Sequence, residues 1–229
     1  MGCNCSRSLS SEFLINIFWE SLKLRTKSYK DIVDLIRTKK SNTQPIKPNK
    51  WLILLQNLII NTDYAEQITN VFNEALTVAR DEYKNEGLLF LSLVLLGQGT
   101  ETEFVKHFIN TAMTQGGLKD SVSILPDKNI TVIKKESLKT FIKYYINLIT
   151  LLGVKHVSSL SDNKQLFEEK LNANFSKENQ KKILEQCIFN GINGDDDRDC
   201  IDIAEFWKDN YLMLKEDTAL RESLSFNTK

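Results

Sequence analysis

The chain contains only three prolines and nine glycines in 229 residues, so long stretches are free to form uninterrupted α-helices. Apolar residues recur in these stretches at spacings of three and four, which is the period of one helix face. This pattern predicts helices over 10–22, 29–37, 51–60, 63–83, 88–96, 102–115, 135–152, 163–174, 177–189 and 204–214. We therefore expect an all-α chain, whose length is ample for a hydrophobic core.

The charge of the chain is balanced as a whole but uneven along the sequence. Lysine plus arginine and aspartate plus glutamate number 30 each, so no overall charge favours nucleic acid. Residues 21–50 carry a local net charge of +7, whereas six acids and one arginine lie between 195 and 205. The basic segment suits either attraction to anionic lipid headgroups or a solvated helix face and linker.

The first six residues, MGCNCS, fit the pattern for N-myristoylation, with a glycine after the methionine and Ser6 in the hydroxyl position. We expect myristate on Gly2 and palmitate on Cys3 and Cys5. A single myristoyl chain gives only marginal membrane binding, with an association constant of about 10⁴ M⁻¹, so a second signal is needed for stable anchoring. The alternative is a disordered leader in which the cysteines are incidental.

Other features of the sequence argue against an enzyme, a secreted disulfide framework and a membrane span. Two of the four cysteines lie in the acylation motif, and the only histidines, His107 and His156, are not in a metal or catalytic spacing. No nucleotide-binding or hydrolase motif is present. The most apolar runs, 51–60 and 87–97, are too short to cross a bilayer. We expect a non-catalytic protein in a reducing compartment.

Two segments share the order helix, polar loop, short β-prone stretch and helix. In the first, Ile130-Thr131-Val132-Ile133 precedes the helix at 135, and in the second Cys200-Ile201-Asp202-Ile203 precedes the helix at 204. This arrangement resembles a pair of EF-hands. Together with the acylation motif, it is similar to the neuronal calcium sensors and the calcineurin B-like regulatory subunits. The resemblance implies an EF-hand-like fold in which a short antiparallel ribbon joins the two loops.

The resemblance also implies a calcium ligand set, which this chain matches only in part. In the second loop Ile201 takes position eight, Asp202 position nine and Glu205 position twelve. The first half of that loop is irregular, because Gly194 and Arg198 stand where oxygen ligands belong. The two interpretations are a weak Ca²⁺ site and a solvated acidic loop, and the residues of the site would be Asp195, Asp197, Asp202 and Glu205.

The first loop has lost its ligands altogether. Ser137 replaces the bidentate glutamate at position twelve, and Pro126, Lys128 and Ile130 fall at the first three ligand positions. We expect no ion there, but the helices and the ribbon can persist because apolar packing holds them together.

These features predict four regions: a lipidated leader (1–9), a helical N-terminal lobe (10–98), a degenerate EF-hand-like pair (99–215) and a flexible tail (216–229). The expected function is that of a lipid-anchored regulator or adaptor that binds a partner protein at the cytoplasmic face of a membrane. With only three methionines, a promiscuous methionine-lined groove is not expected. The alternatives are a structural subunit of a cytoskeletal or ciliary assembly and a weak calcium sensor.

Overall fold

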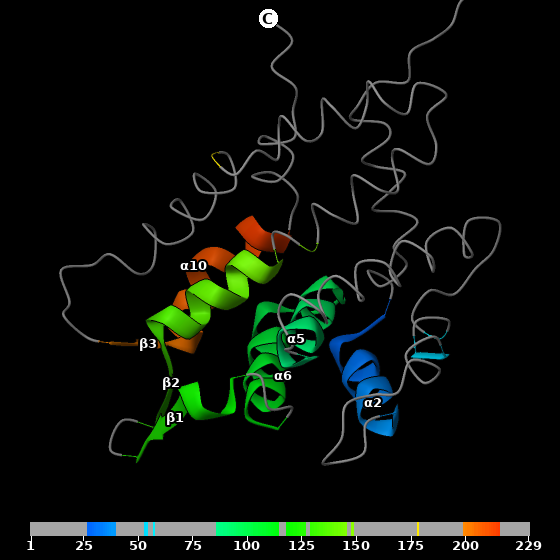
Figure 1. The fold of residues 1–229 in the computed structure, drawn as a ribbon, viewed down its shortest axis with the longest axis horizontal. Coiled ribbons are helices and arrows are strands. Elements are labelled where there is room, and N and C mark those ends of the chain that lie inside the picture. Colours follow the sequence, from blue (N-terminus) through cyan, green and yellow to red (C-terminus); the bar gives the residue numbers. More distant parts are fainter. Residues whose placement is uncertain are drawn as a thin grey trace, which may run out of the picture.

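The computed structural model describes residues 27–39, 53–54, 57, 86–114, 118–126, 129–145, 148, 178 and 199–215. Within these residues the chain is mostly helical and contains one small antiparallel sheet (Figure 1). The expectation of an all-α chain with a short antiparallel ribbon is therefore right that helices dominate, but the described residues are not purely helical, because a third strand joins the ribbon to make a small sheet. The helices expected at 10–22, 63–83 and 163–174 and the tail at 216–229 lie outside the described residues.

Four helices are bounded within the described residues, and a fifth helical segment covers residues 135–145 and includes residue 148. The bounded helices are α2 (Tyr29–Lys39), α5 (Glu86–Leu96), α6 (Glu101–Thr114) and α10 (Ile203–Lys215). Each begins and ends within two residues of the bounds that the apolar spacing predicts. The spacing is a reliable signal here because each helix has apolar residues that are buried.

Polar side chains fix the starts of α2 and α6, since the first N–H groups of a helix have no partner within it. The Ser28 hydroxyl accepts a hydrogen bond from Asp31 N–H at 3.1 Å before α2. Thr100 and Glu103 form a reciprocal pair before α6: Thr100 N–H donates to the Glu103 carboxylate at 2.9 Å, and Glu103 N–H donates to the Thr100 hydroxyl at 3.3 Å.

The sheet has the strand order β1-β2-β3, with β1 at Val122–Leu125, β2 at Ile130–Lys134 and β3 at Cys200–Asp202. Both pairings are antiparallel. In the hairpin of β1 and β2, Val122 lies opposite Ile133. Between β2 and β3, Ile133 lies opposite Ile201. A 3₁₀ turn, η2 (Lys119–Ser121), leads into β1.

Helix α5 is the most deeply buried element of the described part, because residues 87–96 are all buried. Helix α2 lies against it through a close backbone contact at Gly97, where an added Cβ would come within 2.6 Å of Ile32 Cδ1. Two backbone hydrogen bonds reinforce this contact: Gln98 N–H donates to the Lys27 carbonyl at 2.7 Å and Tyr29 N–H donates to the Gln98 carbonyl at 3.2 Å.

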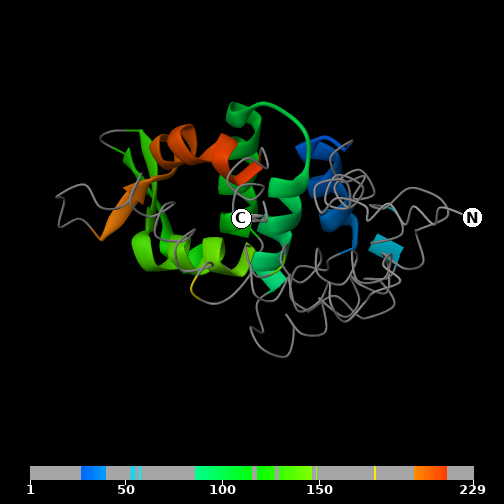
Figure 2. The same cartoon turned by 90° about the horizontal axis from the view of Figure 1, so that it is seen from above.

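An aromatic cluster joins α6 to α10 and to the helix at 135–145. Phe104 and Phe108 lie one turn apart on α6, and both contact the indole of Trp207, with ring centroids 4.7 Å and 5.3 Å away. Phe141 completes the cluster against Phe108 at 5.4 Å. All four rings are fully buried. In Figure 2 helices α5 and α6 lie between the sheet on one side and α2 on the other.

Candidate functional site at the end of the sheet

The acidic segment before α10 is the site for which the sequence predicts ion binding, and the structure describes its second half. Asp202 is the last residue of β3, and its Oδ1 accepts hydrogen bonds from Ala204 N–H at 2.8 Å and from Glu205 N–H at 3.4 Å. Asp202 therefore caps the N-terminus of α10. Its negative charge there also interacts favourably with the positive end of the helix dipole. The Glu205 side chain follows in the first turn and is exposed.

Ser137 is the third residue of the helix at 135–145, as Glu205 is the third residue of α10. Ser137 Oγ donates to Ser121 Oγ at 2.7 Å in a partly buried position. This bond ties the start of the helix at 135–145 to the residue that precedes β1. Ser137 offers a neutral hydroxyl that is already in a hydrogen bond, so it does not supply the bidentate carboxylate that an EF-hand calcium site requires.

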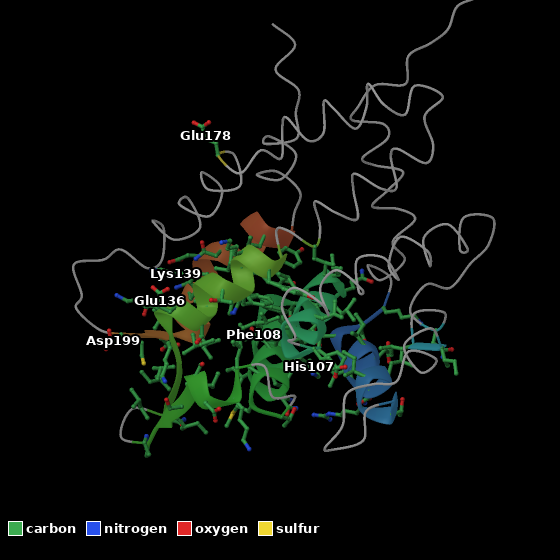
Figure 3. The ribbon with its side chains drawn as sticks, in the orientation of Figure 1. His107, Phe108, Glu136, Lys139, Glu178 and Asp199 are labelled. Carbon is green, nitrogen blue, oxygen red and sulfur yellow. The ribbon has the colours of Figure 1, made fainter. Side chains whose placement is uncertain are left out.

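The two segments meet at a further backbone contact, where Lys135 N–H donates to the Asp199 carbonyl at 2.9 Å. Asp199 precedes β3, and Figure 3 shows it beside Glu136, near the start of the helix at 135–145. Both helices that leave the sheet are thus fixed at their first turns by hydrogen bonds. These bonds and the aromatic cluster hold the two helices against the sheet.

Of the four predicted metal ligands, the structure describes Asp202 and Glu205. Asp195 and Asp197, like the expected acylation sites Gly2, Cys3 and Cys5, lie outside the described residues. In the described part of the chain, no three histidine, cysteine, aspartate or glutamate side chains are grouped so that they could hold a metal ion. The described half of the loop supplies two carboxylates, and one oxygen of Asp202 is already used in capping α10.

Charged and titratable groups gather on the opposite face of α6, toward α2. Desolvation by burial lowers the pKa of His107 below its ordinary value of 6.5, and the nearby charges of Lys106 and Arg37 lower it further. His107 Nδ1 is buried and has no hydrogen-bond partner among the described residues. In Figure 3 His107 lies on the α2 side of α6, whereas Phe108 is on the side of the aromatic cluster.

The apolar spacing predicts a loop at 122–125, where the structure has strand β1. This strand carries two of the three large apolar side chains that are well exposed in the described residues: Ile124 is 54% exposed and Leu125 is 40% exposed. The only local signal is the run Val122-Ser123-Ile124-Leu125 followed by Pro126, which is short and contains a single β-branched pair.

Among the described helices, none combines the length and the apolar character needed to cross a bilayer. Comparison with known proteins finds no matching family model, no similar curated protein and no similar solved structure.

Proposed function

We propose that this protein is a lipid-anchored, non-catalytic regulator or adaptor, in which a degenerate EF-hand-like pair binds a partner protein at the cytoplasmic face of a membrane. The observation that carries the proposal is the pairing of Ile133 with Ile201 at the centre of the contact between β2 and β3. Each isoleucine is followed, two residues later, by the first residue of a helix. This repeated arrangement about one strand pair supports an EF-hand-like relationship between the two units.

The contacts around this pair support a scaffold that does not depend on an ion. The hydroxyl of Ser137 bonds to Ser121 where a calcium ligand would stand, and Asp202 caps α10. The aromatic rings of α6, α10 and the helix at 135–145 are buried against one another. Because apolar burial supplies most of the favourable free energy of folding, this packing is sufficient to hold the helices in place.

The membrane part of the proposal rests on the sequence. The MGCNCS motif offers Gly2 for myristate and Cys3 and Cys5 for palmitate, and the basic segment at 21–50 follows closely. Two acyl signals together give stable anchoring, and basic residues near anionic headgroups add about 1 kcal/mol each.

The test of anchoring is membrane fractionation of cells that express the full chain, combined with intact-mass spectrometry of the purified protein. We expect an added myristoyl mass and a membrane-bound protein that becomes soluble in the Gly2→Ala variant. A Cys3→Ser, Cys5→Ser double variant is expected to bind only transiently, whereas Cys187→Ser is the matched control and should fractionate like the native chain. A Gly2 that carries no acyl group would refute the anchoring.

The same fractionation separates the adaptor from a structural subunit of a large assembly. Detergent is expected to release an acylated adaptor from the pellet. If the native protein and the Gly2→Ala variant both stay with a detergent-resistant filament, the structural role replaces the adaptor role.

A calcium sensor is the second candidate, and the carboxylates of Asp202 and Glu205 at the start of α10 favour it. Calorimetric titration with Ca²⁺ tests this candidate. Heat of binding that disappears in Glu205→Gln and persists in the control Glu101→Gln would support a sensor. No heat at an ion concentration of about 1 mM, the weak end of protein calcium sites, would exclude it.

A further inference from the structure

The outer edge of β1 is an unusual feature of the sheet. Strand β1 pairs with β2 on one side, and no backbone hydrogen bond from another described segment reaches its other side. The N–H and C=O groups along such an edge are available to pair with an added strand. Natural sheets commonly protect their edges with lysine or with an inward-pointing charge. The four residues of β1 include no charged residue.

The side chains of this edge are also unusually exposed. Among the large apolar side chains that the structure describes, three are well exposed, and two of them are the consecutive residues Ile124 and Leu125. The third, Ile53, is 44% exposed and lies outside the sheet. Two of the three exposed large apolar side chains of the described residues are therefore neighbours on one strand.

The geometry of a strand indicates what kind of partner would cover these side chains. Successive side chains point to opposite faces of a sheet, so Ile124 and Leu125 lie on different faces. Ile124 is on the face of its cross-strand neighbour Thr131, and Leu125 is on the face of Ile130. A helix docked on the sheet would cover only one face. A strand added along the edge brings its own alternating side chains next to both.

We propose that the outer edge of β1 is a docking site for an extended segment of a partner protein, which joins the sheet as a fourth strand. The segment that fits is uncharged where it pairs with Val122–Leu125 and has aliphatic or β-branched side chains beside Ile124 and Leu125. The inference deepens the proposed adaptor function, on which it rests, by naming the surface that receives the partner.

The size of the edge favours a partner segment over a second copy of this chain. A stable dimer buries at least about 1,000 Å² of surface, and a pair of four-residue strands by itself offers much less. The edge alone is expected to bind weakly. Such weak binding becomes effective when both proteins are held on one membrane, because tethering raises their effective concentration.

The test uses the full-length, unacylated chain and a labelled synthetic peptide of sequence NITVIKK, which is the sequence of residues 129–135. This peptide contains the strand that already pairs with the inner edge of β1. Fluorescence anisotropy is expected to show saturable binding below about 1 mM, and Ile124→Lys and Leu125→Lys are each expected to weaken it at least about tenfold. Ile53→Lys is the matched control, because it places the same charge on the other exposed isoleucine, and it should bind like the native chain.

A peptide with N-methyl groups at alternate residues provides a second control, since it keeps the side chains but cannot form the strand hydrogen bonds. Circular dichroism verifies that each variant is folded. The proposal is overturned if the native chain does not bind the peptide, if binding survives both lysine substitutions, or if the N-methylated peptide binds equally well. Self-association of the native chain that Ile124→Lys abolishes would make a second copy the occupant. Acylation and membrane fractionation are measured separately, so failure of this docking site is distinguishable from failure of the anchoring.

Discussion

The hydroxyl groups of Tyr29 and Tyr211 form a buried hydrogen bond, although Tyr29 begins α2 and Tyr211 lies in α10. The Tyr211 hydroxyl also donates to the Gly99 carbonyl at 2.9 Å. Because that bond uses the single proton of Tyr211, the Tyr29 hydroxyl is the donor between the two tyrosines. Burial, together with this bond, raises the pKa of Tyr29 above its ordinary value. The two side chains connect the first and the last described helices through the turn that precedes α6.

The first prediction concerns this tyrosine pair. Tyr211→Phe removes both the bond to Tyr29 and the bond to Gly99, whereas Tyr29→Phe removes one. We expect losses in the free energy of unfolding of about 2–3 kcal/mol and about 1 kcal/mol, respectively. Urea unfolding followed by circular dichroism measures both values. The double variant should cost less than the sum of the two, and strict additivity would mean that the hydroxyls do not interact.

The second prediction concerns the aromatic cluster. Trp207 is fully buried against Phe104 and Phe108, so Trp207→Ala should lower the free energy of unfolding by about 3–5 kcal/mol through lost apolar burial and the cavity left behind. The exposed neighbour Lys208 provides the control, since Lys208→Ala should change the free energy of unfolding by less than about 0.5 kcal/mol. Equal effects of the two substitutions would contradict the packing described above. Circular dichroism is the suitable probe, because removing a tryptophan alters the fluorescence signal.

The third prediction concerns pH. The pKa of His107 is lowered in the folded state, so the unfolded chain binds this proton more readily. The contribution of His107 to stability is complete above its ordinary pKa of 6.5 and is lost as the pH falls from there through the folded-state pKa. Protonation would add a positive charge near Lys106 and Arg37, which the carboxylates of Asp34 and Glu103 offset only in part.

His107→Gln is therefore expected to flatten the fall in stability below pH 6.5. Denaturant unfolding measured over a series of pH values gives the comparison. A slope that is the same in His107→Gln as in the native chain would assign the acid sensitivity to other groups. The carboxylate of Glu103 titrates in a separate, more acidic range, because hydrogen bonds from Thr100 lower its pKa below 4.5.

The fourth prediction concerns the turn that holds α2. Gly99 has a φ of +153°, which L side chains rarely adopt, and a Cβ added there would come within 2.7 Å of the Tyr29 ring. Gly99→Ala should destabilise the chain by more than about 1 kcal/mol. Hydrogen exchange is expected to show faster exchange in α2 than in α10, since the strain falls on the contact with α2. Unchanged protection of α2 would show that the turn tolerates a side chain.

The sequence predicts best those helices and strands whose conformation is determined by their own residues. The spacing of Ile32, Val33 and Ile36 gives α2, and the apolar run at 87–96 gives the buried helix α5. The β-branched residues of β2 likewise predict its extended conformation. Strand β1 is different, because its four residues are too few to distinguish a strand from a loop, and only pairing with β2 fixes their conformation.

The candidate site likewise contains one contact that the local sequence predicts and one that it does not. Asp202 is placed before a helix by the local sequence, so its position near the start of α10 follows from the chain itself. The bond between Ser121 and Ser137 could not be predicted, since it depends on the hairpin bringing two segments together.

The sequence by itself determined where the described helices form and which of their faces are apolar. Only the tertiary structure decided that Ile133 lies opposite Ile201, that Tyr29 bonds to Tyr211, and that Ile124 and Leu125 are exposed on a strand that pairs on one side only within the described residues. The physical reason is the range of the interactions. Helix formation depends on neighbours three or four residues away, whereas strand pairing and side-chain burial depend on segments that meet only when the whole chain has folded.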